Sequence, residues 1–329
     1  MKTVRMQKYN SPESLQLLDI EKPNPKDNEV LIKVCASTIN SYDFKKMKGK
    51  PIVMRLQNGI FSPKKNSLGC DVAGIIEKIG KNVTNFNIGD TVFCCLADGY
   101  GDNAYSEYVC ANENIIAIKP DSVSFEEIAS IPMAGVTALQ ALRNFGEIQE
   151  GQKVLINGAS GGVGTFAIQI AKAHGAEVTG VCRTESLSTL SSLGADYVID
   201  YTVEDFMESK KKYDLIIDIV ANHTFSEYKS ILTENGFCVM VGFSSFSHML
   251  NTAVNSLLSK KNKQKIKMLL AQNAVVSDLI HVSELVQEKK IHPTIDKTFL
   301  LEDISKAFQY FETEHITGKL IISIDSNNS

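Results

Sequence analysis

Residues 157–164 read Asn-Gly-Ala-Ser-Gly-Gly-Val-Gly, so that four glycines crowd into eight positions. A strand-like apolar run at 153–156 comes directly before them, and a helical pattern over 165–174 follows. Between a strand and a helix, glycines permit a tight turn and let backbone N–H groups at the helix start approach a pyrophosphate. The three positions of a G-x-G-x-x-G fingerprint fall on Ala159, Gly161 and Gly164. We therefore expect a dinucleotide to bind at Ser160, Gly161, Gly162, Val163 and Gly164; a glycine-rich loop without a ligand is the alternative.

The second strand of this pattern ends at Val181-Cys182-Arg183-Thr184, with no acidic residue before Glu185. An NAD site usually offers a carboxylate at this place to the ribose 2′-hydroxyl. An arginine pairs instead with a 2′-phosphate through charge-assisted hydrogen bonds. The pattern therefore favours NADPH over NADH, with Arg183 and Thr184 at the cofactor. The alternative is that Arg183 is a surface residue of a strand-to-helix loop.

The composition is that of an ordinary globular protein, with 329 residues of which 43% are hydrophobic and 22% charged. A formal net charge of -4 gives no reason to expect nucleic acid as a partner. No apolar stretch has the length of a signal peptide or a membrane span. The seven cysteines are scattered, mostly within strand-like runs, which favours reduced thiols in a cytoplasmic protein.

The first part of the chain is predicted to be rich in β-structure. Short β-branched runs separated by turn signals indicate a barrel or sandwich. These runs lie at 30–36, 71–80, 91–96 and 115–118.

From Ser124 the pattern changes to strands that alternate with helix-length segments. The strands are apolar on both faces, which is typical of a doubly wound parallel sheet in an α/β protein. They lie at 154–156, 177–181, 197–199, 215–219 and 237–241. A Lys-rich segment at 251–273 is expected to be helical and to leave the sheet. The tail then predicts helices at 283–290 and 301–314 and strands at 294–299 and 319–324.

A series of short motifs, spread over nearly the whole chain, resembles one known family. The motifs are Leu68-Gly69-Cys70-Asp71-Val72-Ala73-Gly74, Asn87-Ile88-Gly89-Asp90-Thr91-Val92, Ala134-Gly135-Val136-Thr137-Ala138, Leu193-Gly194-Ala195-Asp196 and Gly318-Lys319-Leu320-Ile321-Ile322. Together with the glycine loop they resemble the medium-chain dehydrogenases/reductases of the zinc-free, quinone-oxidoreductase-like branch. The resemblance implies a GroES-like catalytic domain made of residues 1–123 and 273–329, a Rossmann domain at 124–272, and a homodimer.

Zinc-dependent members of this family hold a catalytic metal with an early Cys, a His in a Gly-His-Glu triplet, and a further Cys or carboxylate. The corresponding places here read Asn40 and Gly69-Cys70-Asp71, and no cysteine lies near Ala134. Cys70 and Asp71 alone do not supply the three protein ligands of a catalytic zinc site. Cys94, Cys95 and Cys110 lack the spacing of the family's structural zinc lobe. We therefore expect no metal.

The resemblance also suggests the residues of the site. It places Asn40, Tyr42 and Asp43 at the substrate end, with Asn40 as a hydrogen-bond donor to a developing oxyanion, or as the residue that holds a water there. Tyr42 is a candidate proton donor or an ordinary half-buried aromatic residue, and Asp43 is a site residue or a structural cap. Five further cofactor contacts follow from the resemblance: Thr137, Tyr201, Gly242, Phe243 and Lys319, with a charge at the strand edge as the alternative for Lys319. Residues 45–66 are expected to shape the substrate pocket, with Met54, Leu56, Ile60 and Phe61.

Without a metal, a plain alcohol or unconjugated carbonyl is hard to activate, because nothing strong polarises its oxygen. A conjugated acceptor is easier to reduce, because hydrogen bonds or water can stabilise the charge that its oxygen bears. The sequence therefore favours an enzyme that transfers a hydride from NADPH to a quinone or an α,β-unsaturated carbonyl compound. A zinc-free alcohol or aldehyde reductase and a non-catalytic NADPH-binding sensor are the alternatives.

Overall fold

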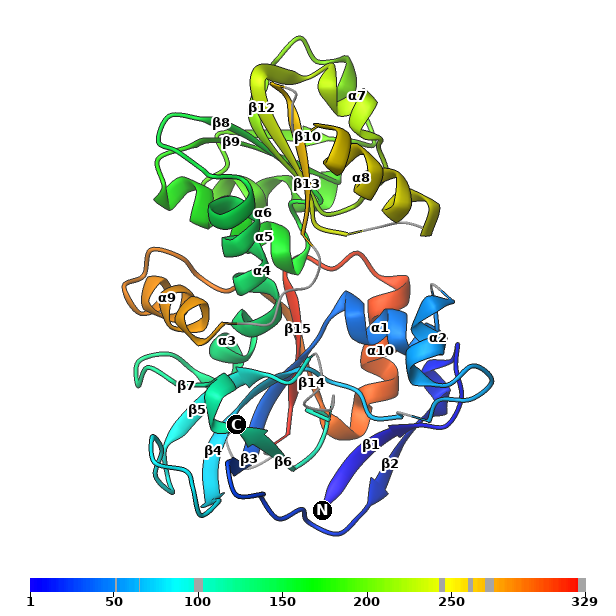
Figure 1. Ribbon diagram of the computed structural model, residues 1–329, viewed down its shortest axis with the longest axis vertical. Helices are drawn as coiled ribbons and strands as arrows, with labels where there is room; N and C mark the ends of the chain where they lie inside the picture. Colours follow the sequence, from blue (N-terminus) through cyan, green and yellow to red (C-terminus); the bar gives the residue numbers. More distant parts are fainter. Residues whose placement is uncertain are drawn as a thin grey trace. The chain divides into compact units, whose positions relative to one another are not determined.

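The computed structural model describes residues 1–50, 52–64, 66–97, 103–242, 246–259, 263–269 and 275–324, with the side chains of residues 53, 54, 57 and 246–249 left aside. The chain forms two compact units (Figure 1). Unit 1 comprises Met1–Ala134, Asn273–Gln287 and Ile295–Ser329, and unit 2 comprises Gly135–Gln272 and Glu288–Thr294. The domain boundaries that were predicted from the sequence, after residues 123 and 272, remain predictions.

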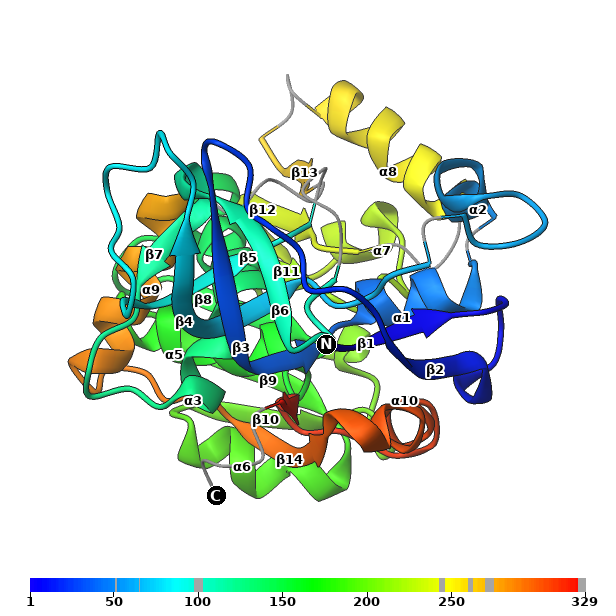
Figure 2. The ribbon, with the colours of Figure 1, turned by 90° about the horizontal axis from the view of Figure 1, so that it is seen from below.

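Unit 1 is built on a seven-stranded sheet in the order β14-β15-β3-β4-β5-β7, with β6 paired to β3. Figure 1 shows β3, β4, β5 and β7 as neighbours in this order, and Figure 2 shows β1 beside β2. All its pairs are antiparallel except β14 with β15, and β1 and β2 form a separate antiparallel ribbon. The strands are β1 (Lys2–Met6), β2 (Leu15–Asp19), β3 (Glu29–Ile39), β4 (Asp71–Ile79), β5 (Thr91–Cys95), β6 (Tyr108–Asn112), β7 (Ile116–Ile118), β14 (Ile295–Leu300) and β15 (Lys319–Ser323).

The late strand β15 completes a sheet that the first hundred residues begin. Its apolar run, Leu320 to Ile322, is buried and continues a core that α10 covers with Phe308. Tyr105 and Phe308 meet edge to face in this core, with ring centroids 6.0 Å apart. The helices of unit 1 are α1 (Ser41–Lys48), α2 (Val53–Asn58), α3 (Phe125–Ala129), α9 (Val276–Gln287) and α10 (Ile304–Thr313).

Unit 2 is a six-stranded parallel sheet in the order β10-β9-β8-β11-β12-β13. The chain runs outward from β8 in one direction and then from β11 in the other, so the topological switch point lies between β8 and β11. The strands are β8 (Lys153–Asn157), β9 (Glu177–Cys182), β10 (Tyr197–Asp200), β11 (Tyr213–Asp218), β12 (Leu232–Met240) and β13 (Lys265–Met268). The helices are α4 (Val136–Gln140), α5 (Gly162–Ala173), α6 (Leu187–Ser192), α7 (Phe225–Lys229) and α8 (Phe246–Ser259).

The structure confirms the expected fold class, a GroES-like β-rich part and a Rossmann-like parallel sheet. It corrects the expectation for 251–273, where helix α8 ends at Ser259 and β13 then joins the sheet as its edge strand. The alternation Lys265-Ile266-Lys267-Met268 has the period of a strand, and Ile266 is buried. The high lysine content concealed this pattern. Helix α9 also begins earlier than predicted, at Val276.

Among the described residues, no helix combines the length and the apolar character that crossing a bilayer requires. The seven cysteines are free thiols, and six of them are buried.

Candidate functional site

The glycine loop connects β8 to α5 in unit 2, as the sequence predicted. Gly158 has φ +86°, a backbone conformation that favours glycine, and turns the chain away from the end of β8. Helix α5 begins with Gly161 at the N-cap, and in the part of the chain that the structure describes no side chain caps its first turn. The first turn of α5 contains the N–H groups of Gly162, Val163 and Gly164. These groups therefore keep the donor capacity and partial positive charge that bind an anion.

The space around the loop fits a pyrophosphate. A Cβ added at Gly161 would meet only the carbonyl oxygen of Gly158, at 3.7 Å, so the chain leaves this position open. A Cβ added at Gly164 would lie 2.3 Å from the same oxygen and 2.6 Å from Ala159 Cα. Gly164 is thus required by the packing of the helix on the loop, whereas Gly161 leaves room for a ligand.

Three predicted cofactor residues come together at the ends of β9 and β10. The Nε of Arg183 donates to the hydroxyl of Tyr201, 2.5 Å away, and the guanidinium lies 5.7 Å from the centroid of that ring. Thr184 donates its hydroxyl to Asp200, which also accepts from the N–H and hydroxyl of Thr202. These hydrogen bonds lower the pKa of the Asp200 carboxyl. The sequence did not indicate Asp200, because the ribose acid is expected on the preceding strand.

A second feature missed from the sequence lies at the switch point. Asn157 ends β8 and Asp218 ends β11, and Asn157 Nδ2 donates to Asp218 Oδ1 at 3.0 Å and to the hydroxyl of Tyr228 at 3.1 Å. Asp218 Oδ1 also accepts from the N–H of Ala221, which holds this alanine at φ +58°. Asp218 is fully buried, and its Oδ2 has no hydrogen-bond partner among the described residues. Burial raises the pKa of its carboxyl.

The remaining residues of unit 2 that were predicted to contact the cofactor are Thr137, Gly242 and Phe243. Thr137 is half-buried on α4, and Gly242 follows β12, where an added Cβ would lie 3.2 Å from the carbonyl oxygen of Ile219. Phe243 lies outside the described residues. Roles for these residues stay predictions.

The predicted substrate loop of unit 1 exposes its apolar side chains. Leu56 on α2 is 68% exposed, Ile60 55% and Phe61 95%, and the side chain of Met54 lies outside the described set. Directly before Ile60, the hydroxyl of Tyr9 donates to the carbonyl of Gly59 at 2.7 Å. The loop is therefore held at Gly59, next to its exposed apolar side chains.

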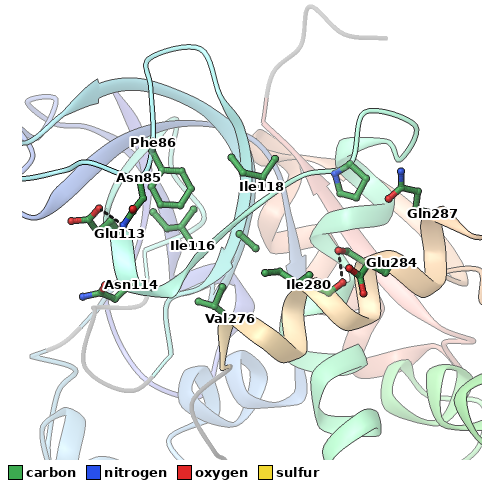
Figure 3. A pocket seen from close by; sticks show the side chains of 13 residues that line it. Asn85, Phe86, Glu113, Asn114, Ile116, Ile118, Val276, Ile280, Glu284 and Gln287 are labelled. Atoms are coloured by element: carbon green, nitrogen blue, oxygen red, sulfur yellow. Dashed lines mark hydrogen bonds between the residues drawn. The ribbon is translucent and has the colours of Figure 1, made fainter.

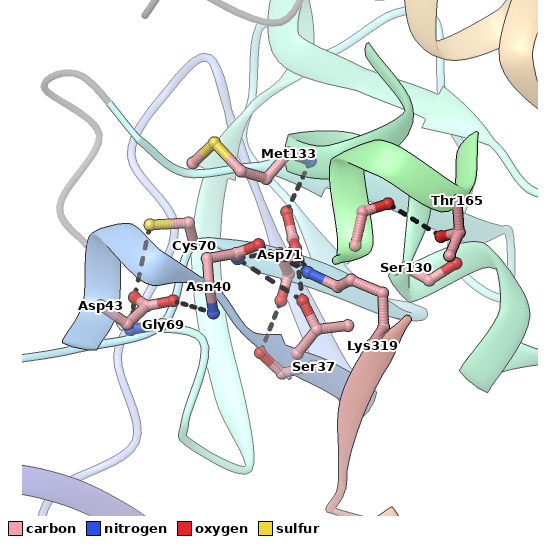
Figure 4. A network of polar contacts seen from close by, with 12 residues as sticks. Ser37, Asn40, Asp43, Gly69, Cys70, Asp71, Ser130, Met133, Thr165 and Lys319 are labelled. Carbon is pink, nitrogen blue, oxygen red and sulfur yellow. Dashed lines mark hydrogen bonds and ion pairs between the residues drawn. The ribbon is translucent and has the colours of Figure 1, made fainter. Parts of the chain in front are cut away.

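Asn40 and Asp43 occupy the junction between β3 and α1 (Figure 4). Asp43 is fully buried, and its carboxylate accepts from the N–H of Asn40 and from the N–H of Gly69, both at 3.0 Å. The first of these bonds caps α1, so the geometry favours a structural role for Asp43, one of its two interpretations. Tyr42 is half-buried on α1, and its predicted part as proton donor stays open.

Asp71, at the start of β4, is the centre of the buried network in Figure 4. Its Oδ2 accepts from Thr38 Oγ1 at 2.5 Å and from Asn40 Nδ2 at 2.9 Å, and its Oδ1 accepts from the N–H of Met133 at 2.9 Å. Met133 belongs to a π-helical turn, Ile131–Gly135, that contains Pro132. Proline interrupts a helix's hydrogen-bond ladder, and π-turns of this kind recur at functional sites.

Lys319 also joins this network, which the sequence did not indicate. Leu320 on β15 pairs with Ile39 on β3, so the register brings Lys319 beside Asn40. The ammonium of Lys319 donates to Asn40 Oδ1 at 2.5 Å and lies 3.6 Å from Asp71 Oδ2.

The residues at the metal-ligand places of zinc-dependent relatives do not fit a zinc ion. Asp71 is engaged by Thr38, Asn40 and Met133, and the Lys319 ammonium beside it would repel a second cation. Cys70 Sγ points to Asp43 Oδ1, 3.6 Å away. Over the part of the chain that the structure describes, no group of three or more His, Cys, Asp and Glu residues could hold a metal ion.

A cavity of about 660 Å³ lies elsewhere in unit 1, between the edge strand β7 and helix α9 (Figure 3). Its wall is apolar, with Phe86, Ile116, Ile118 and Ile280, and its rim carries Glu113 and Glu284. None of the predicted catalytic or cofactor residues lines it.

Known families match both parts of the chain. A family described as alcohol dehydrogenase GroES-like domain matches residues 26–121, and a family described as zinc-binding dehydrogenase matches residues 193–322.

Three known proteins are similar over almost the whole chain. A chloroplastic quinone-oxidoreductase homolog from Spinacia oleracea is 33% identical over 94% of this chain and 94% of its own length. A 2-methylene-furan-3-one reductase from Solanum lycopersicum is 31% identical, over 95% of this chain and 76% of its own. The structure of Escherichia coli quinone oxidoreductase complexed with NADPH superimposes with a TM-score of 0.84 and 26% identity, over 98% of this chain and 100% of its own.

The two loop glycines give the first prediction. Gly161→Ala should leave the free energy of unfolding within about 0.5 kcal/mol of wild type, because nothing in the chain opposes the methyl group. It should weaken the binding of a dinucleotide by about tenfold or more, measured by fluorescence titration. Gly164→Ala should instead destabilise the protein by about 1–3 kcal/mol, measured by denaturant unfolding. Unchanged dinucleotide affinity in Gly161→Ala would contradict the assignment of the loop.

The buried carboxyl of Asp218 gives the second prediction. Because its pKa is raised in the folded protein, ionisation opposes folding, so wild type loses stability as the pH rises from the unfolded pKa, about 3.9, through the folded one. Asp218→Asn removes this ionisation. The Tm of the variant minus that of wild type should therefore increase as the pH rises from about 4 through the raised pKa of the folded protein. The exposed Asp121→Asn serves as control, and a pH-independent difference for Asp218→Asn would refute the account.

Proposed function

Because the chain belongs to the medium-chain dehydrogenase/reductase superfamily, in its quinone-oxidoreductase-like branch, we propose that it is an NADPH-dependent oxidoreductase. Its acceptors are quinones or α,β-unsaturated carbonyl compounds, and it needs no zinc. The observation that carries this proposal is the open position at Gly161 beside the uncapped start of α5, in the same unit as the Arg183 and Tyr201 pair.

The cofactor part of the proposal rests on unit 2. The N–H groups at the start of α5 bind the pyrophosphate, and Arg183 with Tyr201 binds the 2′-phosphate, since a guanidinium pairs well with a phosphate. The oxygens of the neighbouring Asp200 are taken by Thr184 and Thr202. Thr137, Gly242 and Phe243 are proposed to face the nicotinamide. The NADPH in the Escherichia coli relative supports the same cofactor here.

The acceptor part rests on unit 1. When bound, reduced nicotinamide supplies a hydride. The chain must then stabilise negative charge on the acceptor oxygen. A conjugated acceptor requires less of this stabilisation than an isolated carbonyl group. One of the two Nδ2 protons of Asn40 makes only a long contact, with Nδ2 3.5 Å from Thr38 Oγ1. We assign this proton as the hydrogen-bond donor to the acceptor oxygen. Tyr42 is proposed to deliver the proton. The names of the Spinacia oleracea and Solanum lycopersicum relatives support quinone and enone acceptors.

An acceptor panel tests the reaction class. Steady-state oxidation of NADPH should be measured with simple quinones, with α,β-unsaturated ketones and with unconjugated aldehydes. Turnover is expected with the first two groups and none with the aldehydes, because the site offers hydrogen bonds and no metal to polarise an isolated carbonyl. Reduction of the aldehydes at comparable rates would indicate an alcohol or aldehyde reductase. Tight NADPH binding with no turnover of any acceptor would indicate a binding protein.

The cofactor preference is tested at Arg183. Arg183→Ala should weaken NADPH binding by about tenfold or more, which corresponds to the loss of a charged hydrogen bond, and leave NADH binding unchanged. Titration of both cofactors against wild type and variant measures this. Arg143→Ala, which removes an exposed arginine from the same unit, is the matched control. If Arg183→Ala changes both affinities equally or neither, the assignment to the 2′-phosphate is wrong.

A further inference from the structure

Lys319 places a positive charge in the interior of unit 1. Its side chain is 4% exposed and that of Asp71 is fully buried. Burial lowers the pKa of the lysine ammonium, while Asp71 and Asp43 oppose this effect. An isolated buried charge would be very costly, so the ammonium depends on its two partners, Asp71 and Asn40. Lysine is rarely so fully buried, and Lys319 is buried at the first residue of β15.

The charges on either side fix the orientation of the Asn40 carboxamide. Oδ1 faces the Lys319 ammonium at 2.5 Å, and Nδ2 faces the Asp71 carboxylate at 2.9 Å. Turning the amide over would put NH₂ against a cation and C=O against an anion, so the reversed orientation is excluded. The ammonium also withdraws charge from Oδ1, which makes the Nδ2 protons stronger donors.

The network lies in the region of the metal ligands of zinc-dependent relatives. By family resemblance, Asn40 stands at the place of the early Cys ligand and Asp71 at the Glu of the Gly-His-Glu triplet, and Lys319 lies against both. In those relatives the metal polarises the oxygen of the substrate. Here the cation beside the corresponding residues is an ammonium carried by β15.

We propose that Lys319 is a positioning residue that takes over the electrostatic part of the missing metal: together with Asp71 it fixes the Asn40 carboxamide in one orientation, in which the second Nδ2 proton serves the acceptor, and it supplies the fixed positive charge of the site. This inference rests on the proposed function. It differs from the cofactor contact that family resemblance implies for Lys319, because the ammonium is directed to Asn40 and Asp71 within unit 1.

Acceptors of graded electrophilicity test the proposal in Lys319→Met. For a weakly activated α,β-unsaturated ketone, kcat should fall about 100-fold, the effect of losing an oxyanion-stabilising group. For a strongly oxidising quinone, whose reduction needs less stabilisation, the loss should stay below about tenfold. The Kd for NADPH should remain within about threefold of wild type. Lys306→Met, which breaks an exposed ion pair with Asp303 in the same unit, should change none of these values.

Two outcomes of this experiment would overturn the proposal. An equal loss of kcat with every acceptor would indicate general structural damage. A loss confined to the affinity for NADPH would assign Lys319 to the cofactor instead.

A double variant separates charge from folding. Lys319→Met alone leaves Asp71 buried without its counter-ion and should lower the Tm. In Asp71→Asn/Lys319→Met both charges are absent, so the Tm should rise back toward wild type, while kcat with the weakly activated ketone should stay low. Recovery of both Tm and kcat in the double variant would reduce Lys319 to a structural role.

A measurement without turnover tests the clamp itself, that is, the hold of Lys319 and Asp71 on the Asn40 carboxamide. In side-chain ¹H–¹⁵N spectra of the cofactor-free protein, the Asn40 Nδ2 protons should exchange slowly with solvent in wild type and in Lys306→Met. They should shift and exchange faster in Lys319→Met. Identical Asn40 signals in wild type and Lys319→Met would refute the clamp. If wild type reduces no acceptor while these spectra behave as expected, the proposed function fails and the clamp stands.

Discussion

The buried carboxylate of Asp71 is the constraint around which unit 1 is organised. A charge with no exposure must be compensated by hydrogen bonds and an opposite charge, and its four partners come from three separate parts of the chain. Thr38 lies near the end of β3 and Asn40 directly follows it, Met133 lies in the π-turn, and Lys319 begins β15. Satisfying Asp71 therefore aligns the N-terminal sheet with a strand that arrives almost two hundred residues after that turn, and this alignment sets the carboxamide of Asn40.

Unit 2 solves a different problem with backbone groups. The glycine loop leaves the start of α5 uncapped, so a diffuse positive potential is available without a buried ion. The buried pair Asn157 and Asp218 stiffens the switch point by holding the turn at Ala221. Fixed donors in both units need little reorganisation when charge develops in a reaction, which is the general advantage of a preorganised polar site.

Much of this could be predicted from the sequence, for reasons that are local. The alternation of apolar runs and helices gave the parallel sheet, and glycine spacing next to a strand gave the loop. What could not be predicted depends on register and burial. β13 was hidden because its lysines mask a period of two. The contacts of Lys319 with Asn40 and Asp71 were not predicted, because nothing local shows that Leu320 pairs with Ile39. The roles of Asp200 and Asp218 likewise arise only when strand ends from different segments meet.

The central claim is that the chain directs a hydride from NADPH to a conjugated acceptor. The most direct measurement uses NADPH carrying deuterium at both C4 positions of its nicotinamide and an α,β-unsaturated ketone, with the product examined by NMR. The account predicts one deuterium at the carbon β to the carbonyl and a solvent-derived proton at the α carbon. A product without deuterium at the β carbon, or deuterium at the carbonyl carbon of an allylic alcohol, would contradict it.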